Sequence, residues 1–479
     1  MDEIIAPGTD AGLFENLRRS GFVRYARTGL TVVCLGAVLF LWWVLASNRS
    51  PGKIFGFYSN QRFILLILTS YVLGWAIYYL IDRQPFSAKT ANCGLTTASL
   101  LILFGLIELP AMLGWINYGE VILPTQKVLN KPWENPSHQI DRELIHIRRP
   151  RQRLVGETAG DLVHWLGIPT DRRYKFDIEC DSNGFRNDHE IQQAPVVVIG
   201  DSFVEWALVP KSELVSDRLA RMLQVEVANL GQPAYGPQQE LIVLRRYGLG
   251  LRPKVVLWFF FEGNDLLDVS RYERTIRNVD EIMKGRESAK ERSFANNALL
   301  ALAGITSPPP SGDEARRRSG RFLRGRSHEE STLYFAYAGA ELSEQDLASL
   351  QTAQGCFQQA QQLCATAGAK LVIVYVPTKY RVFRDFCEFP EDGYGKTWVL
   401  NDLPSRVETW CKTQAIPYLD LTPSLKESAT KGELVYFTDD GHWNAQGHEV
   451  VTKAIASFLE TSEAFRDEKL KSSIVMKRD

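Results

Sequence analysis

The sequence lacks a net charge of either sign. Its 479 residues include 55 lysines and arginines against 56 aspartates and glutamates, which leaves a formal net charge of -1 at pH 7. General binding to nucleic acid or another polyanion rests on a clear basic excess, so we expect no nucleic-acid partner. The length is too great for one ordinary domain, so the chain should divide into more than one part.

Metal and nucleotide motifs are also missing. None of the seven cysteines forms a CxxC pair, and no histidine spacing suggests a zinc site. Cys356 and Cys364 lie too far apart along one predicted helix to bridge each other, whereas a disulfide between Cys387 and Cys411 stays open. The sequence has neither a phosphate-binding loop nor a dinucleotide-binding fingerprint. We therefore expect a protein that works without a metal or a cofactor.

Long apolar stretches are abundant in the first quarter of the chain. Three of them, at 28–46, 63–81 and 94–116, are long enough to cross about 30 Å of hydrocarbon at about 1.5 Å per residue. Aromatic residues near their ends suit a membrane–water interface: Trp42, Trp43, Tyr78, Tyr79 and Trp115. The sequence predicts a short tail, 1–27, and then a membrane region, 28–116, with three transmembrane helices.

Basic residues indicate the orientation of these spans. Arginines precede the first span, and Arg83 and Lys89 separate the second from the third. Such charges favour the cytoplasmic side, so the amino terminus should lie inside the cell. Three spans then place everything after residue 116 outside the cytoplasm. We predict a multi-pass plasma-membrane (inner-membrane) protein whose large domain after the spans is periplasmic or extracellular.

An acidic residue lies in the third stretch. Glu108 is followed by Pro110. An ionisable group at membrane depth is a candidate for function. Alternatively, the helix ends early and Glu108 lies at the interface.

The segment 117–194 contains scattered prolines and a basic run at 148–153. We interpret it as a stalk and lead-in to the next domain. Its basic run either forms a solvated surface or contacts lipid headgroups or an anionic glycan.

From Val196 onward, short apolar runs alternate with helical patterns. The predicted strands are 196–200, 225–228, 255–261, 371–376 and 418–421. Continuous Val, Ile and Leu runs joined by helices are typical of a parallel sheet covered on both faces, a doubly wound α/β domain. We place this domain at 195–465, with a tail at 466–479. The stretch 268–331 is rich in proline and arginine and breaks the alternation, which predicts a flexible insertion that caps the site.

Polar residues follow several of these strands at the end where each strand stops. Ser202 follows the first strand, Gly231 the second and Asn264 the third, while Asp439, Asp440 and His442 precede the final helix, 445–459. Carboxyl ends of parallel strands meet at one edge of the sheet. A serine, an acid and a histidine at such an edge are the groups of a nucleophilic triad.

These four blocks resemble the SGNH (GDSL-type) hydrolase superfamily over about 196–459, through Ser202, Gly231, Asn264 and His442. The resemblance implies a flavodoxin-like strand order. It also implies that Ser202 is the nucleophile and His442 the general base. The oxyanion hole would then consist of the backbone N–H groups of Ser202 and Gly231 and the side-chain amide of Asn264.

The acid of the triad has two candidates. Asp439 has the Asp-x-x-His spacing of most family members, and Asp440 has an Asp-x-His-Trp spacing that resembles the alginate O-acetyltransferase-like branch. We favour Asp440. The stretch Val-Pro-Thr-Lys ending at Lys379 resembles the same branch.

Three more residues are candidates for substrate binding. Lys379 and Arg381 would hold an anionic sugar or phosphate, or else be surface charges. Trp443 would stack on a sugar ring or pack in the core.

Together these patterns predict a membrane-anchored acyl-ester enzyme that transfers O-acetyl groups to or from an extracytoplasmic polysaccharide. The alternatives are an acetyl or carbohydrate esterase that hydrolyses them, and a non-catalytic glycan-binding or assembly protein. Three spans are too few to carry acyl groups across a membrane. A transferase would therefore need a separate donor, a membrane-bound O-acyltransferase, besides the lipid bilayer and the glycan substrate.

Overall fold

The computed structural model describes residues 29, 32–33, 35–47, 54–55, 58–81, 83–122, 135–284, 289–306, 312–323 and 330–461. The chain forms two compact units. The helical unit contains 1–125 and 287–308, and the sheet unit contains 126–286 and 309–479. The chain therefore passes between the units three times. The predicted tails at 1–27 and 466–479 lie outside the described residues.

Two helices of the helical unit are long and apolar enough to cross a membrane, α2 (Asn60–Ile81) and α3 (Phe86–Met112). They include most of the predicted spans 63–81 and 94–116, and each begins earlier than predicted. Of the predicted first span, the described part is a shorter apolar helix, Leu35–Ser47. Among the described residues, the structure therefore has two helices of spanning length where the sequence predicted three.

Glu108 in α3 makes contact with the predicted insertion. The insertion supplies two helices of the helical unit, α12 (Ala289–Arg292) and α13 (Phe294–Thr306). Glu108 Oε1 accepts the backbone N–H of Ala295 at 2.7 Å and the hydroxyl of Ser293 at 3.2 Å. Arg292 Nε donates to the carbonyl of Ala111 at 2.8 Å. A carboxylate at a helix N-terminus satisfies unpaired N–H groups, so Glu108 fastens α13 to α3.

We expect Glu108→Ala to loosen α13 from α3. Loss of a side-chain cap costs about 1 kcal/mol, which raises the population of the open segment about fivefold. Limited proteolysis or hydrogen exchange of 289–306 would measure the change. Glu108→Gln keeps an acceptor and should have a smaller effect, and Glu281→Ala, on the exposed helix α11 (Val279–Met283), is the control. Equal protection of 289–306 in all variants would contradict the prediction.

The sheet unit is built on five parallel strands. These are β5 (Val196–Ile199), β6 (Val227–Asn229), β7 (Val255–Phe261), β10 (Lys370–Val376) and β12 (Tyr418–Asp420). Their order in space is β12-β10-β7-β5-β6, and every neighbouring pair is parallel. This is the predicted flavodoxin-like order, 2-1-3-4-5 in chain order, and the doubly wound α/β prediction is confirmed.

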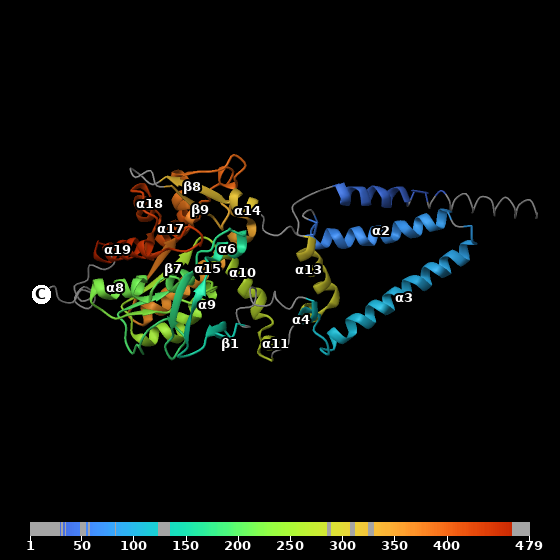
Figure 1. Ribbon diagram of the computed structural model, residues 1–479. Coiled ribbons are helices and arrows are strands. Elements are labelled where there is room, and N and C mark those ends of the chain that lie inside the picture. The colour runs from blue at the N-terminus through green and yellow to red at the C-terminus, as the bar shows by residue number, and fades with distance from the viewer. Residues whose placement is uncertain are drawn as a thin grey trace, which may run out of the picture. The chain divides into compact units, whose positions relative to one another are not determined.

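Helices cover both faces of this sheet (Figure 1). One core contains Val196 and Val198 of β5, and its helices are α8 (Val215–Leu223), α18 (Thr422–Thr430) and α19 (Ala445–Thr461). The other contains Val197 and Ile199, and its helices are α9 (Pro237–Val243), α15 (Glu344–Thr366) and α17 (Leu403–Thr413). Successive side chains of a strand point to opposite faces, so burial of both faces requires a continuous apolar run.

The predicted stalk differs from the structure. The part that we call the lead-in segment, 135–194, is folded and belongs to the sheet unit. Its elements are β1 (His138–Asp141), β2 (Ile145–Arg148), β3 (Arg153–Thr158), α6 (Asp161–Leu166) and β4 (Tyr174–Glu179). Leu144 and Ile147 are buried in the second core, which is the reason that this segment is not an extended stalk.

The predicted flexible insertion, 268–331, is also largely folded. It holds α10 (Asp265–Ile276), α11, α12, α13, α14 (Gly312–Arg317), β8 (Ser319–Leu323) and the start of β9 (Glu330–Tyr334). Strands β8 and β9 form a small antiparallel sheet with β11 (Cys387–Glu388). Arginines of this region have acidic partners: Arg316 pairs with Asp392 and Arg321 with Glu388. The segments 285–288, 307–311 and 324–329 lie outside the described residues.

The described cysteines are all free thiols, so the disulfide left open between Cys387 and Cys411 is not formed. Cys387 lies on β11, whereas Cys411 is buried in the second core on α17. Cys34 lies outside the described residues.

Candidate active site

Ser202 lies where β5 turns abruptly into a short helix, α7 (Ser202–Glu205). Gly200 makes this turn with φ of +154°, and a Cβ there would lie 2.7 Å from Val204 Cγ2. Asp201 caps α7 by accepting the N–H of Phe203 at 2.9 Å. Ser202 is therefore the first residue of the helix, at the carboxyl edge of the sheet.

A chain of hydrogen bonds joins Ser202 to an acid. Ser202 Oγ lies 2.8 Å from His442 Nε2, and His442 Nδ1 lies 2.8 Å from Asp440 Oδ1. The same Asp440 oxygen accepts the backbone N–H of His442 at 2.9 Å. Asp439, the other candidate acid, instead accepts the hydroxyl of Tyr174 at 2.6 Å. Of the two acids, the structure brings Asp440 to the histidine.

The charged forms of His442 and Asp440 stabilise each other. Burial alone would lower the pKa of His442, but Asp440 and the neighbouring carboxylates raise it above its ordinary value. Burial would raise the pKa of Asp440, but the imidazolium of His442 and its hydrogen bonds hold it below the ordinary range. The site therefore favours a carboxylate beside an imidazolium, the charge state that a general base reaches after it takes a proton.

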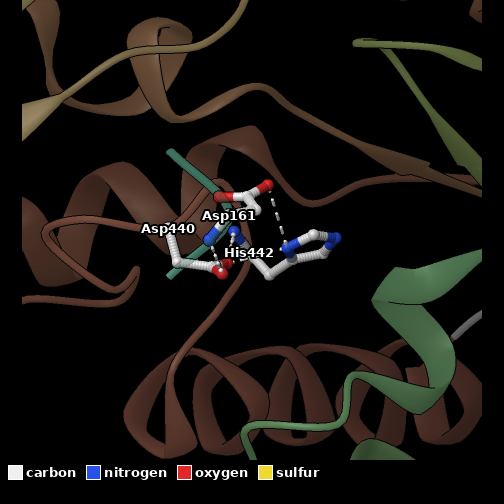
Figure 2. Close-up of side chains that lie close together, drawn as sticks. All are labelled: Asp161, Asp440 and His442. Atoms are coloured by element: carbon white, nitrogen blue, oxygen red, sulfur yellow. Dashed lines mark hydrogen bonds and ion pairs between the residues drawn. The ribbon is translucent and has the colours of Figure 1, made fainter. Parts of the chain in front are cut away.

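A second carboxylate, not predicted from the sequence, lies beside the same histidine (Figure 2). Asp161 Oδ2 is 3.9 Å from His442 Nδ1, and the backbone N–H of Asp161 donates to Asp440 Oδ2 at 2.9 Å. Asp161 begins α6, and an acid at a helix start has no sequence feature that marks it for chemistry. Asp161, Asp440 and His442 could also hold a metal ion by the spacing of their ligand atoms, but a metal on Nδ1 would displace the hydrogen bond to Asp440.

The predicted oxyanion-hole donors lie beyond the carboxyl ends of three neighbouring strands. Ser202, Gly231 and Asn264 follow β5, β6 and β7, which are adjacent in the sheet. The N–H of Gly231 donates to Asn229 Oδ1 at 3.0 Å, and a Cβ at Gly231 would lie 2.6 Å from Val204 Cβ. Asn264 Nδ2 donates to Asp268 Oδ2 at 2.5 Å, and its second N–H remains for another acceptor.

Two aromatic rings pack against the imidazole of His442. Trp206 stacks on the imidazole of His442 with centroids 3.6 Å apart and an interplanar angle of 16°, and the ring of Phe203 lies 4.9 Å away. Arg186 donates to the carbonyls of Trp206 at 2.7 Å and Val209 at 2.9 Å, which fixes the backbone after α7. The imidazole therefore has little freedom to leave Ser202.

A buried ion pair supports α7 from the lead-in segment. Arg148 forms two bonds to Glu205, Nη1 to Oε2 at 2.5 Å and Nη2 to Oε1 at 2.9 Å. Both side chains are buried, whereas Arg149, Arg151 and Arg153 are exposed. The interpretation of the basic run as a surface is therefore wrong for Arg148, because its charge is needed opposite a buried carboxylate.

We expect Arg148→Met to destabilise the sheet unit by about 3–5 kcal/mol, because it leaves Glu205 buried without a countercharge. Thermal unfolding of the full chain, followed by tryptophan fluorescence, would measure the loss. The double variant Arg148→Met, Glu205→Leu removes both charges and should recover much of the stability. A single variant as stable as the wild type would contradict the prediction.

The predicted substrate-binding residues are buried and have partners within the protein. Lys379, the first residue of α16 (Lys379–Phe383), donates from Nζ to the carbonyls of Tyr334 at 2.8 Å and Thr438 at 3.2 Å. Arg381 pairs with Glu262, whose backbone lies 119 residues earlier in the chain. Trp443 has no exposed surface and lies in the first core. These three side chains bind or pack against other parts of the protein, and their burial argues against direct contact between them and a substrate.

A small cavity lies beside the loop that carries Asn264. It has a volume of about 190 Å³ and is lined by Gly263, Leu267, Tyr337 and Val399 among others. A narrower space lined by Tyr337 and Thr378, which also line this cavity, reaches Gly441, the neighbour of His442. The cavity is large enough for a short acyl group or for several water molecules.

Residues 334–476 match a family model described as "SGNH hydrolase-like domain, acetyltransferase AlgX". The matched residues include Asp440 and His442, while Ser202, Gly231 and Asn264 precede them. The match supports an SGNH hydrolase-like domain in this chain. No curated protein matches the chain.

Three solved structures are among those to which this chain is similar. A GDSL-like lipase from Bacteroides thetaiotaomicron is 12% identical with a TM-score of 0.28, and the alignment covers 56% of this chain and 88% of that one. A catalytic mutant of an acetylxylan esterase from Geobacillus stearothermophilus is 10% identical with a TM-score of 0.29, and the alignment covers 57% of this chain and 96% of that one. An acetyl xylan esterase from Butyrivibrio proteoclasticus is 8% identical with a TM-score of 0.27, and the alignment covers 61% of this chain and 74% of that one.

Proposed function

We propose that the sheet unit is an acyl-ester enzyme with Ser202 as nucleophile, His442 as general base and Asp440 as the acid that orients it. The observation that carries this proposal is the unbroken chain of 2.8 Å contacts from Ser202 Oγ through His442 to Asp440. A histidine with Nδ1–H donated to a carboxylate presents Nε2 as the acceptor for the serine proton.

The reaction then proceeds in two halves. His442 Nε2 takes the hydroxyl proton as Ser202 Oγ bonds to the ester carbonyl carbon, and the carbonyl oxygen becomes an oxyanion. His442 then returns the proton to the departing alcohol oxygen, which leaves the acyl group on Ser202. In the second half, a sugar hydroxyl or water attacks the acyl-serine by the same steps in reverse.

The oxyanion would be held by the N–H groups of Ser202 and Gly231 and by the free N–H of Asn264. Asp268 supports this role, because its carboxylate accepts the other N–H of the Asn264 amide and so fixes which end of the amide faces the site. Gly231 would share its N–H between Asn229 Oδ1 and the oxyanion.

The acyl group that we propose is acetyl, and the acceptor or donor is an extracytoplasmic polysaccharide. The match of 334–476 to a domain named for an acetyltransferase supports transfer. Hydrolysis by an acetyl or carbohydrate esterase uses the same three residues, so it is the second candidate. A glycan-binding protein without turnover is the third, and the intact hydrogen-bonded chain argues against it.

We further propose that the helical unit anchors the enzyme in the plasma membrane and that the apolar stretch 28–46 crosses it as a third span, which places the sheet unit outside the cytoplasm. Helices α2 and α3 support an anchor by their length and apolar composition. A membrane-bound O-acyltransferase would supply acyl groups from the cytoplasmic side.

The test uses the full chain in detergent micelles with 4-nitrophenyl acetate as acyl donor. Release of 4-nitrophenol and of free acetate is followed with and without an oligosaccharide acceptor. Acetyl groups that appear on the acceptor at the expense of free acetate would select transfer. Hydrolysis that is indifferent to the acceptor would select the esterase, and no release of either product would refute catalysis.

A further inference from the structure

Asp161 belongs to the lead-in segment, yet its contacts are with the turn that carries the proposed acid and base. Its Oδ1 accepts the N–H of Gly441 at 2.8 Å, and its own N–H donates to Asp440 Oδ2 at 2.9 Å. The two carboxylate oxygens of Asp440 therefore have different partners: Oδ1 bonds to the ring of His442, and Oδ2 accepts the backbone N–H of Asp161. Gly160 allows this approach, because a Cβ there would collide with the carbonyl oxygen of Asp439.

We propose that Asp161 is a positioning residue of the acyl-transfer site. It fixes the turn from Asp440 to His442, and it adds a second negative charge beside the imidazolium that forms when His442 takes the serine proton. This inference rests on the proposed function, because it concerns the same histidine. It assigns to the lead-in segment a part in positioning the acid and base, which lie near the other end of the sheet unit.

The electrostatic part depends on every charge around the imidazole. The titratable groups that act on His442 or on the carboxylates beside it come from several elements: Asp440 on its own turn, Asp161 on α6, Asp201 before α7, Lys379 on α16, Tyr337 after β9 and His448 on α19. Asp439 and Cys387 act in turn on Lys379. Lys379 faces the carboxylates, and its ammonium is held by carbonyl oxygens. Burial, and then the charge of Asp440, raise the pKa of Asp161 to about 7. Asp161 therefore ionises most readily when His442 carries a positive charge.

A purely structural role for Asp161 would be limited to the bond with Gly441. The two roles can be separated, because Asp161→Asn keeps a side-chain oxygen for the Gly441 N–H but carries no charge. Asp161→Ala removes both the acceptor and the charge. Asp171→Asn is the matched control, since Asp171 is an exposed carboxylate on the loop after α6.

The experiment measures how fast a fluorophosphonate probe labels Ser202 at each pH, with the full chain in detergent micelles. Labelling needs neutral His442, so its rate rises with pH through the pKa of that histidine. A nearby negative charge favours the imidazolium and raises this pKa; removing the charge lowers it. In Asp161→Asn we expect the midpoint to move about one unit to lower pH, with at most a small loss of the limiting rate.

In Asp161→Ala we expect the limiting rate to fall about 10- to 100-fold, because the turn is no longer held in place. Asp171→Asn should reproduce the wild-type curve. A wild-type midpoint in Asp161→Asn would overturn the electrostatic part, and a wild-type rate in Asp161→Ala would overturn the positioning part. Should Asp161→Asn not fold, Asp161→Glu takes its place: it keeps the charge, so a midpoint at lower pH would contradict the inference.

The probe also separates this inference from the proposed function. Labelling at Ser202 in a protein that turns over no acyl ester would refute the function and leave the Asp161 comparison valid. Absence of labelling at Ser202 would refute the nucleophile itself. Normal labelling and turnover with an unmoved midpoint would refute the inference alone.

Discussion

Ser202→Ala is expected to reduce acyl release and acyl transfer at least about 10³-fold, because it removes the hydroxyl that would carry the acyl group. Ser202 Oγ lies 2.8 Å from His442 Nε2, and the residue is 9% exposed. Removing one hydroxyl leaves the packing of α7 intact, so the unfolding temperature should change little. Initial rates with 4-nitrophenyl acetate would measure the loss.

The control is Ser212→Ala, an exposed serine ten residues further along the chain. It should retain the wild-type rate. A Ser202→Ala variant with more than about a tenth of the wild-type rate would show that the hydrolysis proceeds without an acyl-serine, since loss of a nucleophile leaves far less activity.

Asp440→Asn is expected to lower the limiting rate about 10³- to 10⁴-fold, as removal of the carboxylate behind a catalytic histidine does elsewhere. Asp440 accepts three N–H groups, those of His442 Nδ1, the His442 backbone and the Asp161 backbone. An asparagine has one acceptor oxygen and an amide that can only donate. It would therefore favour the imidazole with its proton on Nε2, which cannot take a proton from Ser202.

Asp439→Asn provides the comparison for this prediction. Asp439 accepts the hydroxyl of Tyr174, a bond that an asparagine oxygen can keep, and its ion pair with exposed Arg172 is long at 4.0 Å. We expect a change of only about two- to threefold. A larger loss in Asp439→Asn than in Asp440→Asn would reverse the assignment of the acid.

The parallel sheet was predictable because burial of both of its faces requires strands that are apolar at every position. The run from Val255 to Phe261 is apolar at every position, and it forms a strand with the predicted bounds. Ser202, Gly231 and Asn264 could be placed on adjacent loops because strand ends meet at one edge, whatever the details of packing. Their roles as nucleophile and donors stay predictions that the variants above test.

The lead-in segment was not predictable by the same means. Strands β1 and β2 have four residues each, too few for an alternation of apolar and polar residues to stand out. Asp161 contacts Gly441, which lies 280 residues away in sequence, so its part in the site depends on tertiary structure alone.

Charged residues at strand ends were misjudged for a related reason. Lys379 and Arg381 follow β10 at the edge where substrates bind in this kind of fold, which favoured a binding role. Their partners, Thr438 and Glu262, come from distant loops. A sequence shows a charge but not the groups that bind it, and burial of a charge together with its partners is visible only in the structure.

The return of the chain to the helical unit at 287–308 has a practical consequence for work with the enzyme in water. A shortened protein that begins after α4 (Tyr118–Ile122) would keep α13 but lose Glu108 and Tyr118, its partners in α3 and α4. Residues 294–306 contain no charged side chain, so the freed helix would promote self-association. A soluble form of the enzyme therefore needs a second excision, in which a short polar linker replaces 287–308.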